Sequence, residues 1–313
     1  MSVALITGSR GFIGRHLALS LSKQGFKVCG IGHGAWTELE RAAWGVDYWL
    51  NGDVTKRNLD VVQTDMGKLD VVFHLAGGSS VGPSLSAPEE DFRRSVLSTS
   101  ELLEWARLAC PDISLVFASS AAVYGAGYSS AIHEGDALAP YSPYGYHKRI
   151  AEEIFESYGI NFGLKVSIVR LFSVYGAELK KQLLWDACSR INQDAKHLVL
   201  GGTGDELRDW FHISDAVDLL QRAAIEATSE SFIINGGTGI AVTVRQVAEE
   251  LCSAWGMGTQ LEFSGESRPG DPRCLVANIG HATSLGFLPG ISWQAGVANY
   301  VKWFKHLNTK VSV

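Results

Sequence analysis

Several features that mark particular classes of protein are missing from this chain of 313 residues. It has only five cysteines, an odd number, and none of them stands in Cys-x-x-Cys spacing: Cys29, Cys110, Cys188, Cys252 and Cys274. This scattered pattern argues against both a disulfide framework and a zinc site, so we expect no metal. A protein that needs no disulfides fits a reducing compartment, and we therefore predict a cytoplasmic location.

Long hydrophobic runs and an excess of basic residues are also missing. The first apolar run, residues 3–6, has no basic segment before it, which favours a strand over a signal peptide. No apolar stretch reaches the length that spans a bilayer, so no membrane partner is expected. The net charge of −6 offers no basic surface, so a nucleic-acid partner is not expected either.

A glycine loop follows the first apolar run directly. The segment reads Thr7-Gly-Ser-Arg-Gly-Phe-Ile-Gly14 and leads into a helical pattern. Gly8 allows a tight turn, Gly11 lets the backbone approach a pyrophosphate, and Gly14 lets the helix pack closely on the strand. The spacing is one residue longer than the commonest fingerprint. Its place between a strand and a helix predicts a dinucleotide-binding site.

The second predicted strand, residues 26–31, lacks the acid that commonly follows it in NAD-binding chains. Gly32-His33-Gly34 stands there instead. With no carboxylate to repel a 2′-phosphate, Arg10 and His33 are placed to line a site for that group. The alternative is that Arg10 is a solvated loop residue and His33 a turn residue. We expect NADP(H), with NAD as the alternative.

Further apolar runs at residues 46–49, 69–75, 113–118 and 165–170 alternate with helical patterns, as in a parallel sheet. Asp53, after the third run, is placed to accept from an adenine amine. His74 is interpreted as a buried strand residue, because no second metal-type residue accompanies it. Ser120 follows the fifth run, at the end of the strand where such sheets bind ligands.

A helix start with a phenol and an ammonium group follows in the stretch Tyr141-Ser-Pro-Tyr-Gly-Tyr-His-Lys148. Ser142 is a good N-cap and Pro143 suits the first helical position. Tyr144 and Lys148, four residues apart, then share one face. A neighbouring ammonium group stabilises a phenolate, so we expect a lowered pKa for Tyr144, which suits a general acid and base. Taken alone, the pair would more often be an ordinary amphipathic helix start.

The motifs TGSRGFIG, HLAG, SSAAVYG and YSPYGYHK, in this order and spacing, resemble the extended short-chain dehydrogenase/reductase family, which modifies nucleotide-linked sugars. The resemblance covers essentially the whole chain. It implies a catalytic triad of Ser120, Tyr144 and Lys148, in which the lysine also binds the nicotinamide ribose. It also implies a homodimer, formed by helices at residues 92–109 and 142–158, and a nucleotide-diphosphate sugar as substrate.

The resemblance further assigns binding residues by position. The residues expected to contact the dinucleotide are Gly8, Arg10, Gly11, Phe12, Ile13, Gly14, His33, Asp53, Val54, Leu75, Ala76, Gly77, Tyr144, Lys148 and Phe172. Those expected to contact the substrate are Ser79, Ser119, Ser173, Lys181, Gln182, Leu183, Arg208, Arg268 and Asp271. Arg208 and Arg268 would each offer a planar fork to a diphosphate.

Departures from the family pattern narrow the chemistry. Its 4,6-dehydratases carry an Asp-Glu pair after the catalytic hydroxyl residue, whereas this chain has Ala121 and Ala122, so dehydration is not expected. The family's frequent asparagines are replaced by Ser95 and Ser173.

We expect an α/β fold: a Rossmann-type doubly wound parallel sheet with a smaller α+β lobe. Residues 1–171 should form the dinucleotide-binding domain, re-entered at about 209–236, and residues 172–313 mainly the substrate lobe. The favoured reaction is reduction of a nucleotide-linked 4-keto sugar. The alternative is a 4-epimerase with tightly bound NAD, and a non-catalytic nucleotide sensor is the third reading.

Overall fold

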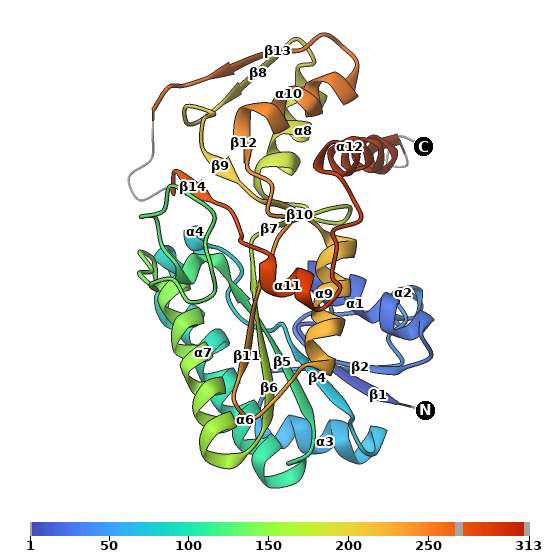
Figure 1. Cartoon of the computed structure of the whole chain (residues 1–313). Coiled ribbons are helices and arrows are strands. Elements are labelled where there is room, and N and C mark those ends of the chain that lie inside the picture. Colours follow the sequence, from blue (N-terminus) through green and yellow to red (C-terminus); the bar gives the residue numbers. More distant parts are fainter. Residues whose placement is uncertain (1, 267–271, 310–313) are drawn as a thin grey trace. The chain divides into compact units, whose positions relative to one another are not determined.

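The computed structural model describes residues 2–266 and 272–309 (Figure 1). Internal contacts divide the chain into two units. Unit 1 comprises Met1–Gly125, Glu134–Leu171 and Ala216–Gly236, and unit 2 comprises Ala126–His133, Phe172–Asp215 and Gly237–Val313. The chain thus re-enters the first unit at Ala216 and not near residue 209, because β10 (Trp210–His212) pairs with β7 (Ser173–Tyr175) of unit 2.

A seven-stranded sheet forms the centre of unit 1, and every pairing in it is parallel. In spatial order the strands are β11 (Phe232–Gly236), β6 (Lys165–Leu171), β5 (Ser114–Ser120), β4 (Val71–His74), β1 (Val3–Thr7), β2 (Lys27–Gly32) and β3 (Tyr48–Asn51). The strand order reverses between β1 and β4, which is the arrangement of a dinucleotide-binding fold. The predicted fold class is confirmed. The third strand begins two residues later than the run at residues 46–49 predicted.

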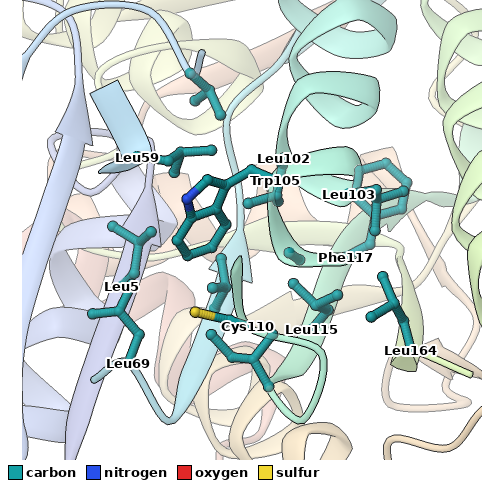
Figure 2. Close-up of a cluster of buried hydrophobic side chains, with 14 of the residues drawn as sticks. Leu5, Leu59, Leu69, Leu102, Leu103, Trp105, Cys110, Leu115, Phe117 and Leu164 are labelled. Carbon is teal, nitrogen blue, oxygen red and sulfur yellow. The ribbon is translucent and has the colours of Figure 1, made fainter. Parts of the chain in front are cut away.

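Helices cover both faces of this sheet (Figure 1). One face carries α3 (Lys56–Met66), α6 (Ser98–Ala109) and α7 (Pro143–Phe162), and α1 (Phe12–Lys23) and α9 (Ile213–Ile225) lie together on the other. Figure 2 shows the core beneath the first group, where Trp105 of α6 packs among leucines such as Leu5, Leu59 and Leu102. The long helix predicted at residues 92–109 is interrupted by a π-helical turn, Arg93–Leu97, before α6.

Shorter elements complete unit 1. They are α2 (Glu38–Ala43), α4 (Val81–Ser86), α5 (Pro88–Phe92) and a 3₁₀ turn at Ala121–Val123. Parallel strands all end at the same edge of a sheet, so the glycine loop after β1, His33 after β2, the Leu75–Gly77 segment after β4 and Ser120 of β5 lie along one edge. That edge is where the candidate site is found.

Unit 2 contains three small sheets. The first pairs β7 with β10, the second joins β12 (Val242–Thr243), β9 (Leu207–Arg208) and β14 (Cys274–Leu275), and the third pairs β13 (Gln260–Phe263) with β8 (His197–Leu200). Its helices are α8 (Gln182–Gln193), α10 (Val244–Trp255), α11 (Gly280–Ser284) and α12 (Trp293–Thr309). The buried carboxylate of Asp209 connects separate segments of unit 2, because it accepts hydrogen bonds from the backbone amides of Thr238, Gly239 and Ala277.

Among residues 2–266 and 272–309, no helix is both long and apolar enough to cross a membrane. The five cysteines all lie in these ranges, where each is buried and unbonded to another cysteine.

Candidate active site

The glycine loop has the geometry of an anion-binding turn. Gly8 has a φ of +74°, and a Cβ there would lie 3.1 Å from the backbone of Leu75 and Ala76. A Cβ on Gly14 would lie only 2.4 Å from the Gly8 carbonyl oxygen. The N-cap of α1 is Gly11, which has no side chain to cap the first amides. These amides and the positive end of the helix dipole suit a pyrophosphate, so the loop fits the expected dinucleotide.

Thr7 and His74 join the glycine loop to the end of β4. The Thr7 hydroxyl accepts from the backbone amides of Leu75 and Ala76, each at 3.1 Å, and lies 2.8 Å from Nδ1 of His74. His74 is fully buried, its Nε2 lies 3.1 Å from the Thr99 hydroxyl, and burial lowers its pKa to about 3. The interpretation of His74 as a buried strand residue is confirmed.

The end of β2 shows why no acid stands there. A Cβ on Gly32 would lie 3.1 Å from the ring of Trp49, so this indole fills the space beside the strand. His33 does not point freely at a ligand, because its Nε2 lies 2.9 Å from an oxygen of Asp53. Arg93 contacts the same carboxylate at 3.4 Å. The guanidinium of Arg10 lies over Gly34, where an added Cβ would meet it at 2.4 Å.

Helix α7, which carries Tyr144 and Lys148, begins as the sequence predicted. The Ser142 hydroxyl accepts from the amide of Gly145 at 3.2 Å, and Pro143 occupies the first helical turn. The amide of Tyr144, which is one of the otherwise unpaired groups at the helix start, donates to the hydroxyl of Ser84 in α4 at 3.1 Å. This second contact, which the sequence did not reveal, fixes Tyr144 in place.

Ser120 and Tyr144 lie in hydrogen-bonding contact. Burial raises the pKa of Tyr144 above its ordinary value, the hydrogen bond from Ser120 lowers it, and the Asp91 carboxylate raises it. The predicted lowering of this pKa by Lys148 is therefore wrong for this arrangement, because burial outweighs the favourable contacts.

Lys148 is buried beside the same site. Its Nζ donates to the carbonyl of Ala118 at 2.8 Å and lies 4.8 Å from the centre of the Phe117 ring. Burial lowers the pKa of Lys148 to about 8, while Asp91 and Glu152 act in the opposite direction. A Cβ on Gly77 would lie 3.5 Å from Nζ, so the loop after β4 lies against Lys148.

A buried pair of ionisable groups lies next to the triad. Nδ1 of His147 is 2.6 Å from Oδ2 of Asp91, and the two side chains are only 12% and 6% exposed. The other oxygen of Asp91 faces Gly78, where a Cβ would lie 1.8 Å from it. His147 stands inside the Tyr144–Lys148 motif and could have been noted there. Asp91 could not, because it is 56 positions away in the chain.

Ser119 is a candidate substrate residue that the structure places inside the protein. It is 3% exposed, and its hydroxyl hydrogen-bonds to the carboxylate of Glu152. Glu152 in turn pairs with Arg170, and both side chains are almost fully buried. The hydroxyl of Ser119 thus belongs to this internal network, an arrangement that does not favour the predicted contact with the substrate. Ser95, in place of the family's asparagine, accepts from the amide of Gly78 at 2.9 Å.

Four substrate candidates of unit 2 lie around the start of α8 or in β9: Lys181, Gln182, Leu183 and Arg208. Gln182 has a φ of +67°, a strained conformation for a residue with a side chain, and such strain is often found at binding sites. Burial lowers the pKa of Lys181. Arg208 donates to the carbonyls of Leu207 and Pro272. Arg268 and Asp271 lie outside the described residues.

The remaining candidates take these places: Phe12 and Ile13 begin α1, Val54 and Phe172 are buried, Ser79 is exposed after β4, Ser173 begins β7 and Leu183 lies in α8.

Within the described parts of the chain, no cluster of three or more histidines, cysteines or acids is arranged to hold a metal ion.

Comparison with known proteins places this geometry in a family. The model of the NAD dependent epimerase/dehydratase family matches residues 4–235. This chain belongs to that family. A curated relative, the UDP-glucose 4-epimerase of Azospirillum brasilense, is 30% identical over 98% of this chain and 93% of its own.

Solved structures of similar proteins agree with the family match. MoeE5 in complex with UDP-glucuronic acid and NAD is 30% identical with a TM-score of 0.85, and covers 100% of both chains. The UDP-glucose 4-epimerase of Thermus thermophilus in complex with NAD is 26% identical with a TM-score of 0.86, over 97% of this chain and 99% of that one. The predicted family is confirmed, and so is the predicted enzyme class, nicotinamide-dependent epimerases and reductases. These relatives favour the epimerase alternative over the 4-keto reductase.

Proposed function

We propose that this chain is a UDP-sugar 4-epimerase. Ser120, Tyr144 and Lys148 lie together at the carboxyl edge of the sheet, next to a glycine loop shaped for a dinucleotide. The contact between the Ser120 hydroxyl and the Tyr144 phenol carries the proposal, since it supplies a hydrogen-bonded proton donor and acceptor at one point. UDP-glucose 4-epimerases among the relatives support the choice of reaction and of UDP.

Each triad residue has a separate role in this proposal. Tyr144 removes the proton from the sugar 4-hydroxyl and returns it to the 4-oxygen after the sugar has presented its other face. Ser120 hydrogen-bonds that oxygen, and Lys148 would bind the ribose of the nicotinamide cofactor. A nicotinamide cofactor supplies the hydride acceptor and donor for carbon 4. The pair Ala121 and Ala122 offers no acid or base for loss of water.

Epimerisation leaves the redox state of the sugar unchanged, so the purified protein should need no added dinucleotide. We expect it to convert UDP-glucose into UDP-galactose, or a related UDP-sugar into its 4-epimer, in a panel followed by nuclear magnetic resonance. Conversion of a 4-keto sugar only when NADPH is supplied would favour the reductase instead.

We propose NAD and not NADP as the cofactor, which reverses the preference drawn from the sequence. An oxygen of Asp53 lies 2.9 Å from Nε2 of His33, the residue that we expected to bind a 2′-phosphate. The Asp53 carboxylate therefore places a negative charge where that phosphate would lie. The relatives solved with NAD support the same choice. Asp53 remains a candidate to accept from the adenine amine.

Cofactor preference gives the first prediction. Protein stripped of dinucleotide should bind NADH more tightly than NADPH, and Asp53→Asn should narrow the difference because it removes a charge that repels a 2′-phosphate. Fluorescence titration of both cofactors measures this. Glu38→Gln, at an acid 88% exposed on α2, is the matched control and should change neither affinity. Tighter binding of NADPH by the unaltered protein would contradict the proposal.

We also propose that the protein is a cytoplasmic homodimer that pairs through α6 and α7. Leu108 of α6 is 63% exposed, and Ile160 of α7 is 72% exposed. Light scattering should give twice the mass of one chain. The double variant Leu108→Glu, Ile160→Glu should give the mass of a single chain. Ile225→Glu, at an isoleucine on α9 that is 81% exposed, is the control. A single-chain mass for the unaltered protein at micromolar concentration would contradict the dimer.

A further inference from the structure

The Asp91–His147 pair is a buried ionisable pair beside the triad to which the proposed chemistry gives no role. It connects three segments of unit 1: Asp91 belongs to α5, His147 belongs to α7, and Gly78, which Asp91 contacts, belongs to the loop after β4. The ring of Phe92 packs against the His147 ring in an edge-to-face arrangement, with the ring centres 5.4 Å apart. A hydrogen-bonded pair at such a junction fixes the position of α7 against the loop that lies on Lys148.

We propose that His147 and Asp91 are positioning residues of the reaction: their hydrogen bond holds α7 in place, and the Asp91 carboxylate acts electrostatically on Tyr144 and Lys148. This proposal rests on the proposed function. It names residues that act through the triad and do not touch the substrate.

The electrostatic part of the proposal follows from the burial of Asp91. Its carboxylate raises the pKa of Tyr144 and also that of Lys148, because a negative charge disfavours a phenolate and favours an ammonium group. Both groups therefore titrate at higher pH when Asp91 is charged. A hydrogen bond from His147 spreads that charge and keeps it at a fixed distance from the phenol.

Other charged groups around the site come from the neighbouring elements. α4, β5 and the 3₁₀ turn after β5 contribute no titratable side chain. Charged groups near this region are His74 of β4 and Glu152 of α7, which both interact with Lys148. Arg93 and Arg94, close to Asp91 in the chain, pair with half-buried Glu90. Of these acids, only Asp91 acts on both Tyr144 and Lys148 in the described part of the chain.

Asp91→Asn tests the electrostatic part. Asparagine keeps the shape and an acceptor for His147 but removes the charge, so both limbs of the pH–rate profile of epimerisation should move to lower pH. Each unit of movement changes the rate on a sloping limb about tenfold. Glu89→Gln removes an exposed carboxylate two residues away and should leave the profile unchanged.

His147 variants test the positioning part. His147→Phe removes the hydrogen bond and should lower kcat by about 10–100-fold with little change in KM, since misplaced reacting groups slow the chemical step more than they weaken binding. His147→Asn, whose amide nitrogen can take the place of Nδ1, should recover most of kcat. Circular dichroism and bound dinucleotide report folding.

The outcomes separate this inference from the proposed function. An inactive unaltered protein would remove the proposed function itself. An active one whose Asp91→Asn variant is folded and keeps the original pH profile would overturn the inference, as would failure of Asp91→Asn to fold, which would make the pair purely structural. Equal loss of kcat in His147→Phe and His147→Asn would overturn the positioning part.

Discussion

Tyr144→Phe is expected to lower kcat by about 10²–10⁴-fold, the usual contribution of a general acid or base. The change removes one oxygen, which hydrogen-bonds with Ser120, and keeps the ring in place. Folding and dinucleotide content should therefore be retained. Initial rates of UDP-sugar epimerisation, with circular dichroism on the same samples, measure both.

Tyr146→Phe is the matched control for this loss. It makes the same chemical change in the same helix, at a ring that is 52% exposed, and should leave kcat within about twofold. Near-normal turnover by a folded Tyr144→Phe variant would show that proton transfer takes place elsewhere in the molecule.

Arg170→Met is expected to lower the free energy of unfolding by about 3–5 kcal/mol, because it leaves a buried carboxylate without its partner. The guanidinium of Arg170 makes hydrogen bonds of 2.8–3.1 Å to Glu152, and it also donates to the hydroxyl of Tyr124 and the carbonyl of Glu134. The two charged side chains are 4% and 3% exposed. Denaturation by urea, followed by circular dichroism, measures the change.

An exposed pair supplies the control for this prediction. Arg222 and Asp218 of α9 lie 2.8 Å apart but are 39% and 50% exposed, so Arg222→Met should cost no more than about 1 kcal/mol. A loss of similar size in both variants would mean that burial of the Arg170 pair does not determine its contribution.

Local motifs were predictable from the sequence because neighbouring residues alone determine them. The cap at Ser142, the proline after it and the glycine loop from Gly8 to Gly14 all depend on backbone geometry within a few positions. The parallel sheet followed from apolar runs that alternate with helical patterns. These features, together with the motifs around Ser120 and Tyr144, were enough to predict the family.

Features that depend on distant residues could not be predicted in this way. The Asp91–His147 contact joins positions 56 apart, and the burial that raises the pKa of Tyr144 comes from the folded surroundings. The resemblance assigned Ser119 to the substrate, but its partner Glu152 lies in a helix 33 positions later in the chain, and the sequence did not indicate this contact. His33 likewise pairs with Asp53, which follows the neighbouring strand β3. The sequence showed that no acid follows β2, but it did not show that an acid from another loop lies beside His33.

Transfer of a carbon-bound label tests the proposed 4-epimerase function most directly. UDP-glucose carrying deuterium at carbon 4 is incubated with the purified protein and no added dinucleotide, and the products are examined by nuclear magnetic resonance. A 4-epimerase removes hydrogen from carbon 4 and returns the same atom to the opposite face, so the 4-epimer should form with deuterium still at carbon 4. The parallel reaction in deuterated water with unlabelled UDP-glucose should place no deuterium there. A product that has exchanged hydrogen at carbon 4 with solvent, or the absence of any 4-epimer across the UDP-sugar panel, would contradict the proposed function.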